Sequence, residues 1–184
     1  MATQALTPLP IHRLGTEAYN RMVASGALDG EPVELLDGWL VEMSPHSAEH
    51  AMAIRRLMRH LAGAEAWPQA QLPLEVPPDA MPEPDLALIE HEPPAGRHPR
   101  TALLAVEVAA TSHDVDRGVK ASLYARAGVP VYWIVDVPGK AVEVRTEPGP
   151  DGYRHCEIYR LGAAVPSPAA GVADLDVAVL FADR

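Results

Sequence analysis

The sequence predicts a single domain, residues 1–184, of mixed α and β structure in which helices flank a central sheet. Its 184 residues suffice for one domain with a substantial core and are too few for two ordinary ones. Hydrophobic residues make up 48% of the chain and charged residues 22%, as in ordinary globular proteins. Short apolar runs typical of strands alternate with segments of helical periodicity, which indicates an α/β (α+β) fold class.

The N-terminal third predicts a helix, a hairpin and a second helix. The first helix spans Thr16–Ala24, with Thr16 as its N-cap. Two apolar runs, Val33–Leu36 and Trp39–Met43, flank Asp37-Gly38, a dipeptide favoured in hairpin turns where both residues need positive φ. Residues Ser47–Ala62 then carry apolar side chains at helical spacing, so this helix can lay one face on a sheet.

The central third predicts strands joined by one helical crossover. Gln71–Val76 has the pattern of a strand, and the apolar runs Asp85–Ile89 and Leu103–Val108 each contain one carboxylate. His113–Ala127 has helical periodicity and is followed by a third apolar run, Val131–Asp136. Strand, helix and strand in succession predict that the second and third runs lie side by side.

The C-terminal third predicts a closing hairpin and an edge element. Ala141–Arg145 and Tyr153–Tyr159 alternate in polarity around a turn near residues 149–152. The tail carries an apolar series that we expect to form the edge element: Leu175, Val177, Val179, Leu180 and Phe181. Its part around Leu180 and Phe181 could contribute to self-association.

Composition bounds the possible functions. The net charge of −10 argues against a non-specific DNA coat protein, but not against a nuclease whose acidic site holds cations. The single Cys156 excludes an internal disulfide and a thiolate zinc site. No apolar run is long enough to span a bilayer, and Met1–Pro8 lacks the features of a secretory signal. We therefore expect a cytoplasmic protein without a membrane partner.

Glu107 is the residue that most strongly suggests chemistry. It lies in an apolar run that should be buried on both faces of a sheet, and an unpaired buried carboxylate is costly. Asp85 opens the preceding strand and should fall beside it. Two adjacent carboxylates repel unless a proton or a cation intervenes, and Mg²⁺ prefers oxygen ligands, to which the Val108 carbonyl could add.

Each acidic residue also has an interpretation without chemistry. Asp85 could cap a turn after Pro84, and Glu107 could pair with Lys120 as a structural ion pair. Asp116 and Lys120 stand four residues apart, as in a solvated helix pair that contributes about 0.3–0.5 kcal/mol. The functional alternative places the Lys120 ammonium over the sheet, where it would orient a hydroxide and stabilise a phosphorane.

Three further polar residues are weaker candidates. Glu34 lies in a hairpin strand, where a carboxylate usually faces solvent. His50 begins a helix, where a histidine is more often a surface or capping residue than a ligand. His46 and His50 are four residues apart and could chelate zinc, but spacing suggests no third ligand, so the sequence argues against a zinc site.

The chain resembles the Uma-two family of restriction-endonuclease-like proteins from about Thr16 to the C-terminal tail. The resemblance rests on short motifs that occur in the family's order: Glu34-Leu-Leu-Asp-Gly38, Val41-Glu-Met-Ser-Pro45, His50, Pro84-Asp85, Val106-Glu-Val108, Asp116-Arg-Gly-Val-Lys120, Tyr124-Ala-Arg-Ala-Gly-Val129 and Tyr132-Trp-Ile-Val-Asp136. Each motif is short, but the ordered series is specific.

This resemblance implies a PD-(D/E)XK nuclease-like fold, with a mixed central sheet flanked by helices, and metal-dependent hydrolysis of nucleic-acid phosphodiesters. It implies that Asp85 and Glu107 are the acidic ligands of Mg²⁺ or Mn²⁺. It also implies that Glu34 is the acidic residue that the N-terminal part of the chain contributes to such active sites. The motif lysine normally stands two positions after the second acid, where this chain has Ala109. Lys120, on the following helix, matches the displaced lysine of the family.

Other departures concern the rim of the site. Ala110 and Thr111 replace the serine and proline that often follow the second acid, and Val131 replaces a glutamate. We expect catalysis by Asp85, Glu107, Lys120 and Glu34, metal binding by Asp85, Glu107 and the Val108 carbonyl, and substrate contacts by His50 and Asp116. The expected partners are nucleic acid, with DNA favoured, and further copies of the chain in a homodimer or larger assembly. The alternative is a catalytically inactive module of the same fold that binds a partner or self-associates.

Overall fold

The structure, a computed structural model, describes residues 11–110 and 113–182. Along the chain its elements are α1 (Thr16–Ala24), β1 (Val33–Leu36), β2 (Trp39–Glu42), α2 (Ala48–Leu61), β3 (Trp67–Gln69), β4 (Leu86–Ile89), β5 (Leu104–Ala109), α3 (His113–Val115), a π-helical turn η1 (Asp116–Lys120), α4 (Ala121–Arg126), β6 (Val131–Asp136), β7 (Ala141–Gly149), β8 (Gly152–Arg160), β9 (Ala164–Val165), β10 (Leu175–Asp176) and α5 (Val177–Phe181). No helix in this part of the chain combines the length and apolar character needed to cross a bilayer.

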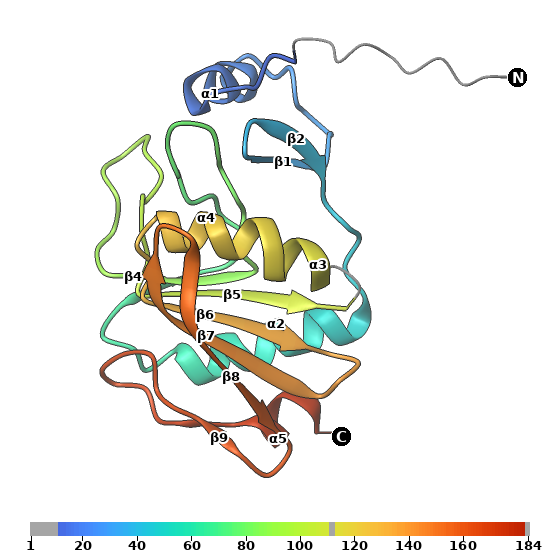
Figure 1. Cartoon of the computed structure of the whole chain (residues 1–184), viewed down its shortest axis with the longest axis vertical. Helices are drawn as coiled ribbons and strands as arrows, with labels where there is room; N and C mark the ends of the chain where they lie inside the picture. Colours follow the sequence, from blue (N-terminus) through green and yellow to red (C-terminus); the bar gives the residue numbers. More distant parts are fainter. Residues whose placement is uncertain (1–10, 111–112, 183–184) are drawn as a thin grey trace, which may run out of the picture.

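The expected mixed central sheet is confirmed. Six strands follow one another in the order β3-β4-β5-β6-β7-β8. Only β5 and β6 pair in parallel, as the strand, helix, strand succession predicted, and all other neighbours are antiparallel. The helical segment α3–η1–α4 connects the parallel pair and lies on one side of the sheet, while α2 lies on the other (Figure 1).

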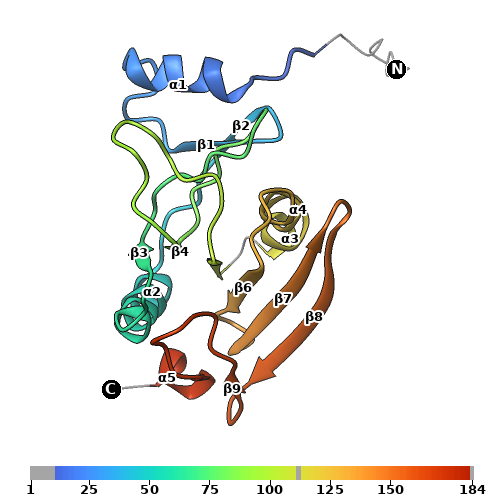
Figure 2. The same ribbon diagram turned by 90° about the vertical axis from the view of Figure 1, so that its left-hand side faces the viewer.

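The two faces of the sheet bury different side chains because successive residues of a strand point to opposite sides. On β5, Leu104, Val106 and Val108 pack with Leu57 of α2 in the larger core cluster. Ala105 faces the other cluster, which includes Ala121 and Tyr124 of α4. Figure 2 shows α2 and the α3–α4 segment on opposite sides of the strands. Glu107 alternates with Val106 and Val108, so it belongs to the face covered by α4.

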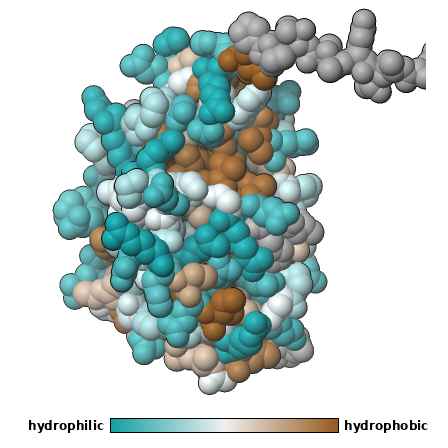
Figure 3. Space-filling view, viewed as in Figure 1, coloured by the Kyte–Doolittle hydropathy of each residue, from teal (hydrophilic) through white to brown (hydrophobic). Residues whose placement is uncertain are grey.

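The hairpin β1–β2 forms a separate two-stranded sheet next to α1. Its turn is of the predicted kind, since Asp37 and Gly38 both have positive φ, 48° and 80°. A backbone bridge between Leu35 and Met81 ties the hairpin to the segment before β4. The space-filling view shows apolar side chains gathered in the region of this hairpin (Figure 3), where Trp39 and Leu40 are exposed.

The strand predicted at Gln71–Val76 is wrong. The edge strand of the sheet is instead β3, Trp67–Gln69, and the segment after it is irregular, with Gln71 at φ 53°. Pro73 explains the difference, because a proline within an apolar run removes a backbone donor and disfavours a strand. Pro68 is tolerated in β3 because this strand lies at the edge.

The C-terminal tail does not form the predicted edge element of the main sheet. Leu175 belongs to β10, which pairs only with β9, and the following residues form the short helix α5. Leu180 is buried against the core beside α2, and Arg56 donates to the carbonyl oxygens of Leu180 and Ala182 at 2.6 Å each. Leu180 is therefore not an exposed surface for self-association.

Replacing Leu180 by alanine should lower the free energy of unfolding by about 2–5 kcal/mol, because it leaves a cavity in the main core. Val179→Ala, next to it on the exposed side of α5, should change the free energy of unfolding by less than about 0.5 kcal/mol. Urea denaturation of both variants measures this difference. Equal effects would mean that α5 does not dock as described.

Candidate active site

A hollow at one end of strands β4 and β5 gathers the catalytic, metal-binding and substrate-binding candidates that the sequence singled out. Its walls come from β1, the segment between β2 and α2, the start of β4, the end of β5 and η1. Among its lining residues are Glu34, His50, Asp85, Glu107, Val108, Asp116 and Lys120. These side chains are separated by up to 86 positions in the chain, so only the tertiary fold brings them together.

Asp85 and Glu107 meet because of the register between β4 and β5. Leu86 pairs with Val106 and Ala87 with Ala105, so the next position of this antiparallel register brings Asp85 opposite Glu107. The Val108 N–H donates to Asp85 Oδ2 at 2.7 Å and fixes the aspartate at the end of the strand pair. The expectation that these carboxylates share one end of neighbouring strands agrees with this geometry.

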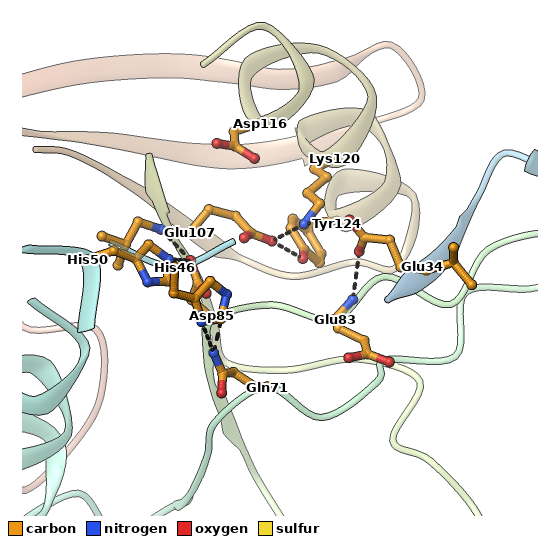
Figure 4. Close-up of polar contacts among 12 residues, drawn as sticks. Glu34, His46, His50, Gln71, Glu83, Asp85, Glu107, Asp116, Lys120 and Tyr124 are labelled. Carbon is orange, nitrogen blue, oxygen red and sulfur yellow. Dashed lines mark hydrogen bonds and ion pairs between the residues drawn. The ribbon is translucent and has the colours of Figure 1, made fainter. Parts of the chain in front are cut away.

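The Lys120 ammonium lies between two carboxylates. Its Nζ is 3.1 Å from Glu107 Oε1 and 3.0 Å from Glu34 Oε1 (Figure 4). All three side chains are buried. Glu34 is therefore not a solvent-facing residue of its hairpin strand, and Lys120 is not the solvated helix residue of the simpler interpretation.

Burial and charge act together on this cluster. Burial raises the pKa of Glu107 well above its ordinary value; Lys120 opposes this rise, while the neighbouring carboxyl groups of Asp85, Asp116 and Glu34 add to it. For Lys120, burial acts to lower the pKa, but the carboxylates of Glu107 and Glu34 outweigh burial and leave the pKa raised. Lys120 therefore keeps its positive charge at neutral pH.

Two members of the site were missed by sequence reasoning. The Tyr124 hydroxyl donates to Glu107 Oε1 at 2.6 Å, and burial raises its pKa well above the ordinary value, so it keeps its proton as a donor. Tyr124 follows Lys120 by four residues, and this helical spacing could have revealed it. Glu83 lines the same hollow, and its N–H donates to Glu34 Oε2 at 3.0 Å. The signal for Glu83 was its place directly before Pro84-Asp85.

His50 approaches the cluster from the opposite face of the sheet. Ser47 caps α2 by accepting the His50 N–H at 3.2 Å, which places the histidine in the first turn of the helix. The His50 ring is buried, and its Nε2 lies 3.0 Å from Asp85 Oδ2. Asp85 thus contacts groups from α2 and β5 through a single oxygen atom.

The π-helical turn η1 places Asp116 and Lys120 in the hollow. The Ala121 N–H bonds to the Asp116 carbonyl oxygen, five residues back, as a π turn requires. Two side chains from neighbouring strands hold this turn: the Tyr132 hydroxyl donates to the Asp116 carbonyl oxygen at 3.0 Å, and Arg145 Nη1 donates to the Arg117 carbonyl oxygen at 2.9 Å. Single π turns inside α-helices occur frequently at functional sites.

The donor atoms of the hollow suit a hard divalent cation. Both hydrogen bonds described for Asp85 are accepted by Oδ2, and both described for Glu107 are accepted by Oε1. Within residues 11–110 and 113–182, the second oxygen of each carboxylate makes no hydrogen bond. Two carboxylates with open oxygens beside a strand carbonyl at Val108 form the kind of ligand set that Mg²⁺ and Mn²⁺ prefer.

A mixed sheet flanked by helices, with an acidic hollow at the ends of two adjacent strands, defines an α+β protein with one acidic candidate site. The family model of Uma2, described as "Putative restriction endonuclease", matches residues 16–179, so the chain belongs to this family. The fold is similar to a crystal structure described as a "putative nuclease belonging to DUF820" from Anabaena variabilis, with a TM-score of 0.65. The two share 16% identity over 82% of this chain and 90% of the other. Comparison with curated proteins found no match.

The pH dependence of stability should reveal how the π turn is held. Glu143 accepts hydrogen bonds from Arg117 and from Arg145. Arg145 in turn donates to the Arg117 carbonyl oxygen in the π turn. Burial acts to raise the pKa of Glu143, but these two guanidinium groups outweigh it and leave the pKa lowered. Because the folded pKa lies below the unfolded value of about 4.3, the charged carboxylate stabilises the fold above that pH and ceases to do so as the pH falls through the folded pKa.

Glu143→Gln should therefore lower the free energy of unfolding by about 1–3 kcal/mol at pH 7, and this loss should shrink in acid below about pH 4. Urea denaturation at both pH values measures it. Glu90→Gln, at an exposed carboxylate, serves as the control and should change stability by less than about 0.5 kcal/mol. A loss that grows in acid would contradict the assigned role of Glu143.

Proposed function

We propose that this protein is a metal-dependent endonuclease of the PD-(D/E)XK type that hydrolyses phosphodiester bonds in nucleic acid, with DNA as the favoured substrate. One observation carries the proposal: Asp85 and Glu107 face each other at the ends of neighbouring strands, next to a buried lysine ammonium. Membership of the Uma2 family and the nuclease-like fold support it.

The chain's own oxygen atoms would hold the metal. The carboxylates of Asp85 and Glu107 would bind Mg²⁺ or Mn²⁺, and the Val108 carbonyl oxygen would complete the protein's share of the ligands. When bound, the ion supplies a Lewis acid for the phosphate and lowers the pKa of a coordinated water. The Tyr124 hydroxyl and the Lys120 ammonium, both on Glu107 Oε1, keep that carboxylate oriented toward the cluster.

The remaining residues act on the substrate and the attacking water. Lys120 Nζ, held between Glu107 and Glu34, would donate a hydrogen bond to the water and stabilise the negative charge that develops on the phosphate oxygens. Glu34, whose Oε1 faces Lys120 and whose Oε2 accepts from the Glu83 N–H, would hold a further water or a second cation through its remaining lone pairs. His50 and Asp116, which also line the hollow, would contact the substrate, His50 at the phosphate and Asp116 through bound water.

The protein's partners follow from this activity. Cutting both strands of a duplex favours a two-fold assembly, and we propose a homodimer or a higher homo-oligomer. The net charge of −10 means that DNA binding should be weak without divalent cations and sensitive to salt. A cytoplasmic enzyme would meet its DNA substrate directly.

Nicking of supercoiled plasmid in the presence of Mn²⁺ tests the activity. Glu107→Gln and Lys120→Ala should each reduce the rate by about 100-fold or more, because each removes a group that stabilises the transition state. Glu107→Gln is close to isosteric and retains a side chain that can accept from Tyr124, so it should remain folded. Circular dichroism melts identify any variant that does not fold.

Lys140→Ala is the matched control, because Lys140 is the only other lysine of the chain and lies outside the hollow. It should nick plasmid at the wild-type rate. Equal residual activity in the wild type, Glu107→Gln and Lys120→Ala would show that the nicking comes from a contaminant and would end the proposal.

One observation favours a second function, that of a non-catalytic module that keeps the fold. The Lys120 ammonium already neutralises part of the acidic cluster, so the site can be satisfied without a cation. Calorimetry with MnCl₂ separates the two functions. An active nuclease should bind Mn²⁺ in the millimolar range or tighter and lose this binding in Glu107→Gln, whereas absence of binding in the wild type would favour the non-catalytic module.

A further inference from the structure

We propose that His46, His50 and Asp85 form a second metal site, which binds a transition-metal ion such as Zn²⁺ or Co²⁺ through one donor atom of each side chain. The donor atoms of these three residues all lie within 4.8 Å of one another. They come from the segment before α2, the first turn of α2 and the start of β4. The site lies beside the oxygen ligands of the proposed nuclease centre and shares Asp85 with them.

Sequence spacing argued against a zinc site because it offered no third ligand for the two histidines. The structure shows why spacing could not reveal a third group. His46 stands before the helix cap Ser47, so the two histidines are not successive turns of one helix, and the third group, Asp85, comes from a distant segment. The imidazole rings instead stack, with centroids 4.2 Å apart and an angle of 25° between their planes.

A second observation concerns the surroundings of the His50 ring. The ring is only 6% exposed, and its Nδ1 is buried without a hydrogen-bond partner in the described part of the chain. Buried polar atoms of side chains nearly always have a partner, and an exception commonly marks a water or an ion. The other ring nitrogen, Nε2, lies 3.0 Å from Asp85 Oδ2, a separation at which both atoms can bind one ion, so Nε2 is the donor atom that His50 offers to the site.

His46 has a supporting partner of its own. The Gln71 side-chain amide lies 3.0 Å from His46 Nδ1 and can present either its nitrogen or its oxygen to that ring atom. With the oxygen facing the ring, Nδ1–H would donate to Gln71 and leave Nε2 free for a metal. Metal-bound histidines are typically held in this way by a second hydrogen bond. His46 is exposed, so its side chain can close on an ion bound at about 2.0–2.1 Å from each nitrogen.

The donor set distinguishes this site from the nuclease centre. Two imidazole nitrogens and one carboxylate suit Zn²⁺, Co²⁺ or Ni²⁺, whereas the all-oxygen set of Asp85, Glu107 and Val108 suits Mg²⁺ or Mn²⁺. The chain would therefore hold two chemically different ions next to each other, linked by the Asp85 carboxylate. The histidine site does not require that the nuclease be active, because metal binding is measured without DNA.

Titration of the purified full chain with Co²⁺, followed by visible absorption and by competition with Zn²⁺, tests the site. The wild type should bind one equivalent of Co²⁺ with the absorption of imidazole coordination, and Zn²⁺ should displace it. His46→Ala and His50→Gln should each weaken Zn²⁺ binding by at least about 10-fold. Loss of a residue that only supports a metal ligand already weakens binding by about this factor, and loss of a ligand itself should cost no less. Because His46 is exposed, His46→Ala should fold normally and keeps the test valid if His50→Gln is unstable.

Two controls separate this site from other sources of metal binding. His60→Ala removes a histidine of α2 whose Nε2 contacts the Ala173 carbonyl oxygen, and it should leave Zn²⁺ affinity unchanged. Glu107→Gln should abolish Mn²⁺-dependent nicking while retaining the Co²⁺ spectrum, so failure of the nuclease proposal and failure of this one are distinguishable. Equal Zn²⁺ affinity in the wild type and His46→Ala, or no binding at millimolar Zn²⁺, would overturn the inference.

Discussion

The candidate site depends on one buried ammonium group. Lys120 is the residue that allows Glu34 and Glu107 to share a hollow, since two buried carboxylates without a cation would repel each other and neither would be well solvated. The lysine also joins separate parts of the fold, because Glu34 belongs to the small hairpin sheet and Glu107 to the central sheet. Removing one member of such a buried group typically costs several kcal/mol, so the hairpin and the helical segment are positioned partly by this charge.

Much of the fold follows from local patterns of the sequence. The hairpin at Asp37-Gly38 and the parallel pair β5–β6 both have short-range signals. So does the end of α4, where Gly128 has a φ of 72°, a conformation that glycine adopts readily. The errors arose where tertiary contacts decide. Pro73 breaks an apolar run that otherwise resembles a strand, and the tail forms α5 because the core beside α2 accepts Leu180.

The sequence could predict those contacts of the candidate site that follow from the order of neighbouring strands. It could not predict contacts between a strand end and a helix on the other face of the sheet. Asp85 and Glu107 could be paired from the order of two apolar runs, and the structure places them opposite each other. The contact of His50 with Asp85 joins a helix on one face to a strand end, and no spacing rule reveals such a contact. The π turn was equally hidden, because its supports, Tyr132 and Arg145, lie on two different strands.

The π turn also corrects an angular drift that a regular α-helix would impose. At 100° per residue, side chains four apart are offset by about 40°, so positions 116, 120 and 124 would spread over about 80° of the helix surface. The wider turn between Asp116 and Lys120 takes back part of this offset before α4 begins. The ammonium of Lys120 and the hydroxyl of Tyr124 can then both reach Oε1 of Glu107, and Asp116 lines the same hollow. A local widening of one helical turn thus lets residues on successive turns act on a single strand residue.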